Sequence, residues 1–391
     1  MQPKKYILPI IVLAQFCCTS LWFAGNSIIT DLIINFNLKA SVLGHLTSAI
    51  QLGFILGTLV FAILTLADKY SPSKVFFLSA LLAALFNLAM SLGNQSFYSL
   101  ILIRFLVGFF LAGIYPVGMK IASDYFKEGL GKSLGFLVGA LVLGTAFPHL
   151  LKSFNGLISW KAIIYFTSLI ALLGGLLILI FVPNGPYKKT LKQFDITVFY
   201  KVFKIKNFRT AALGYFGHMW ELYTFWAFVP MILLSYSNSY IDINLNIPVL
   251  SFIIIGLGGI ACVISGYLSQ IFGVKKLATT SLALSCICCL LTPFVFIVQS
   301  ELFFIAFMIF WGMVVIADSP LFSTLVAQNV ASESKGTALT IVNSIGFAIT
   351  IISIQLLNTL LFFFEIKYLL PILAIGPILG LFAMYNKVKS L

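Results

Sequence analysis

Twelve runs of mostly apolar residues, each long enough to cross a bilayer as a helix, make up most of this 391-residue chain. A spanning helix needs roughly 20 consecutive apolar residues. Charged residues are 9% of the chain, whereas a soluble domain has about 25%. These properties exclude a soluble enzyme, a secreted disulfide-bonded domain, a disordered chain and a coiled coil. The expected spans are 7–29, 41–66, 75–94, 98–122, 133–154, 160–183, 210–236, 247–271, 277–297, 301–328, 337–361 and 366–386.

The lysines and arginines gather on one side of these spans. With the N-terminus inside, 18 of the 24 basic residues face the cytoplasm and four face outward. Because basic residues favour cytoplasmic loops, we expect both termini to be cytoplasmic. The expected location is the cell membrane, namely the inner membrane of a bacterium, which the chain crosses many times. The first run has no small-x-small cleavage site and is expected to remain as a span. The net charge of +13 is scattered between spans, which argues against a nucleic-acid partner.

The longest connection, 184–209, divides the chain into two sets of six spans. It carries seven basic residues and one acid. Its stretch 194–208 mixes aromatic and basic residues, a pattern typical of an amphipathic helix at a membrane surface. We therefore predict an N-terminal six-helix half over 1–183, a basic cytoplasmic linker over 184–209 and a C-terminal six-helix half over 210–391. The chain has no GxxxxGK[ST] motif for nucleotide phosphates.

Similar short loops follow the second and the eighth spans, at an offset of 202 residues. The loops carry the residues Asp68, Lys69 and Lys74 in the first copy, and Gln270, Gly273, Lys275 and Lys276 in the second. Both loops resemble the signature G-x-L-[AS]-D-[RK]-x-G-[RK]-[RK] of the major facilitator superfamily, and each copy keeps a different part of it. With twelve spans in two halves, the sequence is similar over its whole length to that superfamily of secondary transporters.

This resemblance implies an all-α membrane protein of twelve transmembrane helices in two pseudo-symmetric six-helix halves, working as a monomer. It also implies that spans 1, 4, 7 and 10 line a central cavity, while spans 3, 6, 9 and 12 face lipid. In the family, the two loops form a cytoplasmic conformational latch, in which Asp68 would be the acid. An ordinary positive-inside loop is the alternative. Span 4 adds a second likeness, because Arg104 is followed four residues later by Gly108.

Four ionisable residues lie well inside apolar spans, where a charge costs roughly 2.5–3.5 kcal/mol on insertion scales. They are Arg104, His218, Glu221 and Asp318. His218 and Glu221 are three residues apart, so they share a face of span 7 near the bilayer midplane. We predict that Glu221, with help from His218 and Asp318, exchanges the proton that drives transport. The alternatives are an internal ion pair between span 7 and span 4 or 10, and a capping role for Asp318 at a helix break caused by Pro320.

Arg104 is expected to orient an anionic substrate, or else to neutralise Glu221 or Asp318. The other predicted substrate-binding residues are polar or aromatic side chains of the expected cavity-lining spans: Gln15, Trp22, Asn26, Tyr115, Trp220, Tyr223 and Trp311. Such aromatic residues suit a small organic ligand, and they also pack helices. The CxCC cluster at 286–289 has no His or acid nearby in the sequence, so we expect buried thiols there, no metal and no cofactor.

The sequence therefore predicts a secondary active transporter of a small organic solute, acting as a proton symporter in the lipid bilayer. It would work by rocking of its halves around a midplane site. An integral-membrane enzyme is disfavoured because no HExxH or GxSxG motif occurs. A proton-independent facilitator, an exporter of amphipathic compounds and a transport-inactive sensor on the same fold are the alternatives.

Overall fold

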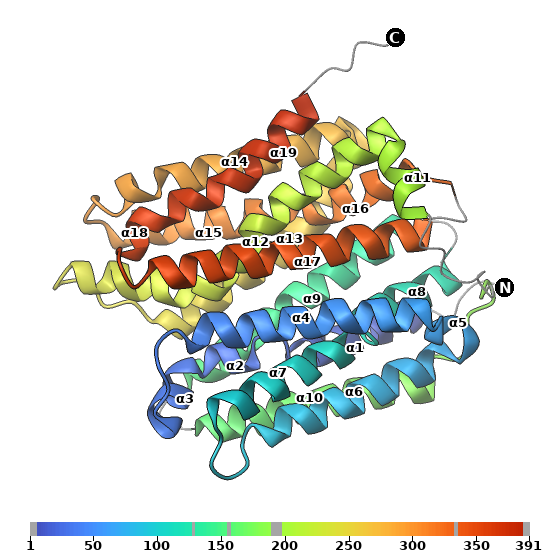
Figure 1. The fold of residues 1–391 in the computed structure, drawn as a ribbon, viewed down its shortest axis with the longest axis horizontal. Helices are drawn as coiled ribbons and strands as arrows, with labels where there is room; N and C mark the ends of the chain where they lie inside the picture. Colours follow the sequence, from blue (N-terminus) through green and yellow to red (C-terminus); the bar gives the residue numbers. More distant parts are fainter. Residues whose placement is uncertain (1–5, 127–129, 155–157, 189–197, 332–334, 386–391) are drawn as a thin grey trace. The chain divides into compact units, whose positions relative to one another are not determined.

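The computed structural model describes residues 6–126, 130–154, 158–188, 198–331 and 335–385, which form helices joined by short turns. The chain divides into two compact units, Met1–Phe194 with Ser251–Gly259, and Asp195–Leu250 with Ile260–Leu391. We call them the N-terminal and the C-terminal unit and describe each by itself (Figure 1). The all-helical architecture confirms the predicted fold class. Part of the expected linker, 189–197, lies outside the described residues, as do both chain ends.

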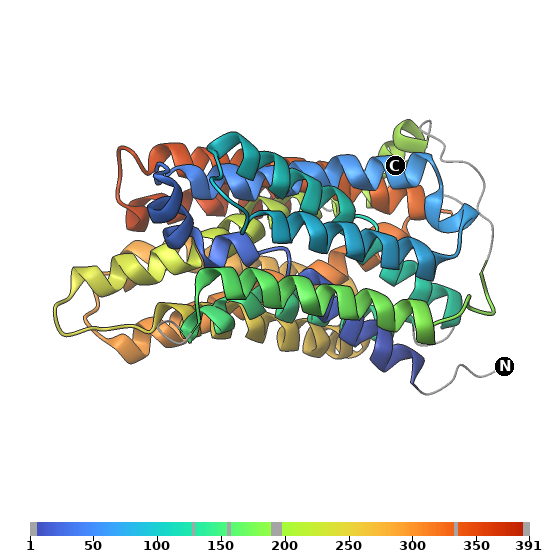
Figure 2. The same ribbon diagram turned by 90° about the horizontal axis from the view of Figure 1, so that it is seen from below.

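The N-terminal unit contains the first six spans. They are formed by α1 (Ile7–Thr19) with α2 (Ala24–Ser27) and α3 (Ile29–Phe36), then α4 (Val42–Ile63), α6 (Pro72–Ala89), α7 (Phe97–Leu111) with α8 (Tyr115–Tyr125), α9 (Leu130–Ser153) and α10 (Trp160–Phe181). A short helix, α5 (Leu66–Lys69), lies in the loop between α4 and α6. Within this unit α10 packs against α6 and α1, and α4 packs against α7 (Figure 2).

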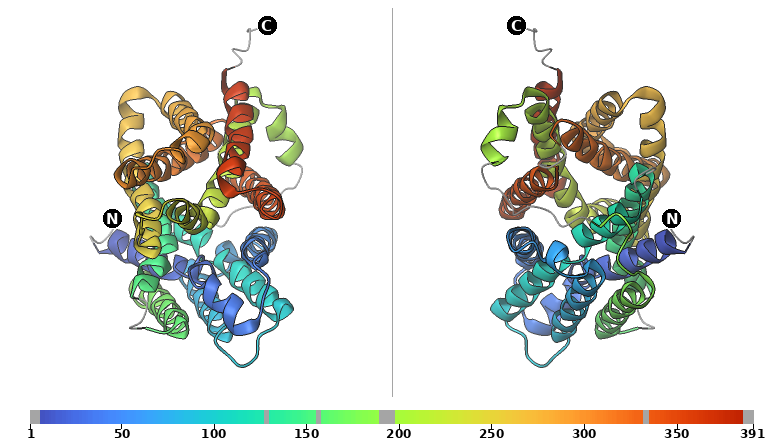
Figure 3. Two further views of the ribbon diagram at one scale, coloured as in Figure 1. Left: turned by 90° about the vertical axis from the view of Figure 1, so that its left-hand side faces the viewer. Right: turned by 90° about the vertical axis from the view of Figure 1, so that its right-hand side faces the viewer.

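The C-terminal unit contains most of the remaining spans. They are formed by α12 (Lys206–Ser239), α13 (Ile247–Phe272), α14 (Val274–Val295), α15 (Glu301–Ala317) with α16 (Ser319–Gln328), α17 (Lys335–Leu360), and α18 (Ile366–Leu369) with the 3-10 helix η2 (Leu370–Ala374) and α19 (Ile375–Tyr385). A short helix, α11 (Val198–Lys204), precedes them. The long helix α12 packs against α17 and α19, and α14 packs against α15, as the end-on views show (Figure 3).

The helices account for all twelve expected spans. Ten described helical segments are long and apolar enough to cross a membrane. The pieces α1 to α3 and the 34-residue helix α12 supply the other two spans. Most ends agree with the sequence prediction to within a few residues. The largest difference is in the first span, which continues to Phe36.

Spans 1, 4 and 10 are each interrupted between two α-helices. Pro116 and Pro320 lie in the first turns of α8 and α16, where a missing N–H removes no intrahelical hydrogen bond. Asp318 is the single residue between α15 and α16, so the break predicted from Pro320 is present. Span 1 is interrupted between Thr19 and Ala24, and this break contains no proline.

Gly273 forms the turn between α13 and α14. Its φ of 87° and ψ of 140° are rarely adopted by residues with a side chain. We expect Gly273→Ala to lower the free energy of unfolding by about 1–3 kcal/mol, because the methyl group strains the backbone. A Cβ at this position would meet nothing within 4 Å, so crowding contributes nothing to the loss. The measurement is the melting temperature of the purified protein.

Gly266→Ala is a matched control for this prediction. A Cβ at Gly266 also meets nothing within 4 Å, but Gly266 lies inside helix α13. Alanine is favoured over glycine there by roughly 0.5–1 kcal/mol. The control should therefore keep or raise the melting temperature, and equal melting temperatures for the two variants would contradict the assigned strain.

Candidate functional site

Glu221 lies in the middle of α12, and its side chain is fully buried in the C-terminal unit. Three neutral side chains hydrogen-bond to its carboxyl group. The Ser285 hydroxyl lies 2.9 Å from Oε2. The Trp311 indole N–H donates to Oε1 over 2.7 Å, and the Cys289 thiol donates to the same oxygen over 3.3 Å. An ionised carboxylate only accepts hydrogen bonds, so three donors suit its charged form.

Two helices position these donors around Glu221. Ser285 and Cys289 are four residues apart on α14, which places them on one helix face. Trp311 belongs to α15, and its ring packs against Phe225 of α12 with centroids 4.3 Å apart. Sequence reasoning named Trp311 but missed Ser285 and Cys289, because the resemblance assigned their span to the lipid side. The available signal was a serine and a cysteine one turn apart within the apolar middle of this span.

His218 contacts Asp318 instead of Glu221. Its Nδ1 lies 2.8 Å from Asp318 Oδ1, and both side chains are only 1% exposed. Because Asp318 lies at the break between α15 and α16, this contact joins span 7 to span 10, as the ion-pair alternative expected. The predicted trio is thus divided into two parts, the hydrogen-bonded Glu221 cluster and the His218–Asp318 pair. The imidazole of His218 contacts Asp318, and no contact between His218 and Glu221 is found among the described residues.

Arg104 is fully buried in the N-terminal unit and binds the main chain of span 1. Its Nη1 donates to the Leu21 carbonyl over 3.1 Å, and its Nη2 donates to the Trp22 carbonyl. Both carbonyls lie in the interruption between α1 and α2, where a helix end leaves carbonyl groups without intrahelical partners. The planar fork of arginine matches two such acceptors at once. A Cβ on Gly25 would lie 3.2 Å from Arg104 Nε, so glycine admits the guanidinium here.

This arrangement differs from the roles expected for Arg104. Its hydrogen-bond acceptors among the described residues are carbonyl oxygens of its own unit, and none is a carboxylate. Its Nε, also buried, has no hydrogen-bond partner within the described part of the chain. Arg104 therefore links span 4 to the interrupted helix of span 1.

Two glutamine amides in the same unit are buried without hydrogen-bond partners among the described residues. They belong to Gln15 of α1 and Gln51 of α4, and both side chains are fully buried. Oε1 of Gln15 lies 2.6 Å from the position that a Cβ on Gly118 would take, so this amide lies against α8. Asn26 is also buried, and it donates to the Thr47 hydroxyl over 2.8 Å. Buried polar groups are nearly always paired, so the two glutamines are exceptions that call for a partner.

The predicted aromatic residues have mixed environments. Trp22 is buried and packs against Phe54, with ring centroids 4.9 Å apart. Tyr223 is buried among aromatic rings, and Trp220 donates its N–H to the Ile372 carbonyl over 3.2 Å. Tyr115 is half-buried at the start of α8. Packing explains most of these contacts, as the sequence alternative allowed.

At the predicted latch, Asp68 pairs with a lysine of span 4. Lys120 Nζ lies 2.8 Å from Asp68 Oδ1 and 3.7 Å from Asp124 Oδ1. Asp124 is four residues beyond Lys120 on the same helix, and this contact is the longer of the two. Asp68 thus joins α5 to α8 within the N-terminal unit. The other polar residues predicted for the two latch loops are exposed. They are Lys69 and Lys74 in the first loop, and Gln270, Lys275 and Lys276 in the second.

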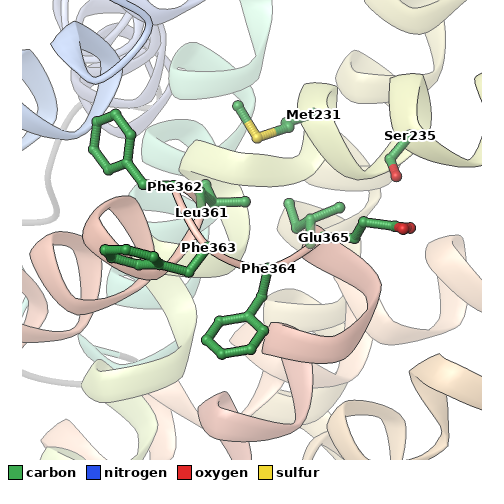
Figure 4. Close-up of a pocket in the computed structure, with 8 residues that line it drawn as sticks. Met231, Ser235, Leu361, Phe362, Phe363, Phe364 and Glu365 are labelled. Atoms are coloured by element: carbon green, nitrogen blue, oxygen red, sulfur yellow. The ribbon is translucent and has the colours of Figure 1, made fainter.

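A pocket of about 430 Å³ opens where α17 leads into α18 (Figure 4). Met231 and Ser235 of α12 line one side, and residues 361–366 line the other. The phenylalanines of this loop, Phe362, Phe363 and Phe364, are exposed. None of the predicted site residues lines this pocket, so it is separate from the Glu221 cluster.

The sequence profile of the Major Facilitator Superfamily matches residues 11–384, nearly the whole chain. The chain belongs to the major facilitator superfamily. This transporter is similar in structure to a variant of the nucleoside transporter NupG, with a TM-score of 0.74 and 13% sequence identity over 98% of this chain and 100% of that one. It is also similar to a bacterial homologue of the human lysosomal transporter Spinster, captured inward-facing and occupied. That match has a TM-score of 0.75 and 13% identity over 97% of this chain and 96% of the other.

At these identities the two solved structures support the fold alone. No curated protein sequence matches the chain. Membership of the superfamily confirms the resemblance seen in the two short loops and in span 4. The protein is therefore a multi-pass membrane transporter with a small-molecule substrate, and it is not an enzyme.

Proposed function

We propose that the protein is a secondary active transporter that couples movement of a small organic solute to protons, with Glu221 as the proton-binding group. The observation that carries the proposal is the burial of this carboxyl group among three neutral donors. An isolated buried charge is costly, and neutral donors repay only part of that cost. Protonation removes the charge, so the closed site favours the protonated form.

This difference between the two charge states supplies a coupling mechanism. Glu221 releases its proton when the site opens to water, because water solvates the carboxylate. It takes up a proton while the site is open to the side with the higher proton concentration, and it loses that proton while the site is open to the other side. Closure around the bound solute is therefore easier with the proton bound than without it, so the solute and the proton cross together. His218, on the same helix as Glu221 and equally buried, contacts Asp318 at the junction of α15 and α16, and this pair is the second part of the proposed coupling site.

The substrate is proposed to meet the N-terminal unit at its unpartnered polar groups. Gln15 and Gln51 offer amide donors and acceptors, and Arg104 offers its Nε–H, which has no acceptor among the described residues. These groups favour a solute with several hydrogen-bonding atoms. Because Arg104 already donates to two carbonyl groups, the solute does not need an anionic group to pair with it. The nucleoside named for one structural neighbour belongs to this chemical class and enters the panel of test compounds.

Uptake into proteoliposomes tests the proposal. Organic acids, amino acids, nucleosides and amphipathic drugs are supplied with and without an inward-directed proton gradient. We expect at least one of them to accumulate above equilibrium only when the gradient is present, and a protonophore to abolish that accumulation. Uptake of the transported compound that ignores the gradient would indicate the proton-independent facilitator instead.

A further inference from the structure

The hydroxyl group of Ser285 lies within hydrogen-bond distance of two acceptors but has a single hydrogen. Its Oγ is 2.9 Å from Glu221 Oε2 and 3.2 Å from the Leu282 carbonyl oxygen. A hydroxyl can donate one hydrogen bond and accept two. Ser285 therefore cannot donate to both oxygens at once. Its hydroxyl hydrogen points either to Glu221 Oε2 or to the Leu282 carbonyl oxygen.

The two oxygens of Glu221 differ in what surrounds them. Oε1 receives the Trp311 indole N–H and the Cys289 thiol. An indole nitrogen only donates, and a thiol is a weak acceptor, so a proton on Oε1 would face groups unable to receive it well. Oε2 contacts the Ser285 hydroxyl, which is able to accept. A proton on Glu221 is thus best placed on Oε2.

We propose that Ser285 is the positioning residue that satisfies both charge states of Glu221, a role that rests on the proposed function of that carboxyl group. When Glu221 is ionised, Ser285 donates to Oε2. When a proton binds, an O–H bond forms at Oε2 and donates to Ser285 Oγ, while the serine hydrogen turns to the Leu282 carbonyl. No proton leaves Ser285, and the carboxyl group gains the only added proton. Each state keeps a full set of hydrogen bonds through one hydroxyl rotation.

No other titratable group competes for Oε2 among the described contacts. On α12, His218 is engaged by Asp318, which comes from the junction of α15 and α16. On α14 the thiols are Cys286, Cys288 and Cys289, of which Cys289 contacts Oε1. The charged residues of the surrounding helices lie near helix ends: Lys206 and Arg209 of α12, Lys275 and Lys276 of α14, Glu301 of α15, Lys335 of α17 and Lys367 of α18. The tyrosines of these helices are Tyr215, Tyr223 and Tyr236 of α12, Tyr368 of α18 and Tyr385 of α19, and none of them has a described contact with Glu221.

The test compares variants by the pH midpoint at which the Glu221 carboxyl group titrates. The full-length protein in lipid vesicles is titrated by infrared difference spectroscopy, and the Glu221 band is the carbonyl stretch that Glu221→Gln removes. Trp311→Phe deletes a donor whose hydrogen bond to the charged carboxylate is stronger than its bond to the neutral carboxyl group, so the midpoint should rise by about one to two pH units. Ser285→Ala deletes a bond from both forms, so its midpoint should move by less than half as much.

Thermal stability supplies the second readout, because the midpoint shift equals the difference between the stability losses of the two charge states. If Ser285 serves both states, Ser285→Ala lowers the melting temperature on both sides of the midpoint. Ser281→Ala is the matched control, since Ser281 is a buried serine one turn earlier on α14 and is not among the described hydrogen-bond partners of Glu221. Ser285→Thr keeps the hydroxyl and should restore the wild-type midpoint.

The outcomes separate this inference from the proposed function. A rise for Ser285→Ala as large as that for Trp311→Phe, with stability lost only above the midpoint, would make Ser285 a simple donor and overturn the inference. Should Ser285→Ala fail to fold, Ser285→Cys keeps the volume with a weaker donor and acceptor, and it should follow the same pattern. A Glu221 band that never titrates while the protein stays folded would overturn both ideas. Gradient-driven accumulation that persists in Glu221→Gln would overturn only the proposed function, because the titration of Glu221 would still be observed in the wild-type protein.

Discussion

Glu221→Gln should abolish solute accumulation driven by a proton gradient while leaving solute exchange intact. Glutamine has the shape of the protonated carboxyl group, and its amide can donate to Ser285 while its oxygen accepts from Trp311. The variant is therefore held in the neutral state and cannot release a proton. With one proton coupled, each pH unit of gradient supports about a tenfold concentration ratio, so the variant should lose about a tenfold ratio per unit.

The measurement pairs gradient-driven uptake with counterflow in the same vesicles. Counterflow needs only the substrate site and the conformational change, so it should persist in Glu221→Gln. Glu301→Gln is the control, because it removes the same charge from an exposed position in the first turn of α15. If Glu221→Gln still accumulates solute in response to the gradient, Glu221 is not the coupling group.

Arg104→Ala should destabilise the protein strongly. The substitution leaves the Leu21 and Trp22 carbonyls buried without their donors and opens a cavity beside Gly25. Each buried unsatisfied group costs about 1–3 kcal/mol, so the free energy of unfolding should fall by about 2–5 kcal/mol. Arg104→Lys should recover part of the loss, since an ammonium group reaches fewer acceptors in this geometry.

Melting temperature and ligand affinity measured together decide between the two roles considered for Arg104. Arg209→Ala is the control, because Arg209 is exposed and donates to a single carbonyl, that of Phe203. A wild-type melting temperature for Arg104→Ala, combined with lost affinity for an anionic substrate, would contradict the helix-stabilising role. That result would restore the substrate role expected from the sequence.

Which features the sequence predicted depends on how local their causes are. Span positions follow from continuous apolar runs, and the break at Asp318 follows from Pro320, so both were predicted correctly. The interruption of span 1 has no proline to announce it. The residue that stabilises this interruption is Arg104, which is more than 80 positions away in the sequence from the two carbonyl groups that it binds.

The sequence placed Glu221, His218 and Asp318 inside spans and predicted that they act together, whereas the structure separates the Glu221 cluster from the His218–Asp318 pair. Burial of charge identified Glu221, His218 and Asp318 without reference to neighbours. Which side chain meets which carboxyl group depends on the rotation of each helix about its axis, and apolar runs do not define that rotation. His218 and Glu221 are three residues apart and were expected to act together, yet a rotation of about 60° between them directs each to different partners.

All six cysteines are free and buried within the two units. Buried thiols react slowly with alkylating reagents, because the reactive thiolate is disfavoured away from water. A cysteine introduced at an exposed position would therefore be labelled selectively, with little reaction at the six native cysteines. Spin or fluorescent probes placed in this way, one on each unit, would follow the distance between the units through the transport cycle.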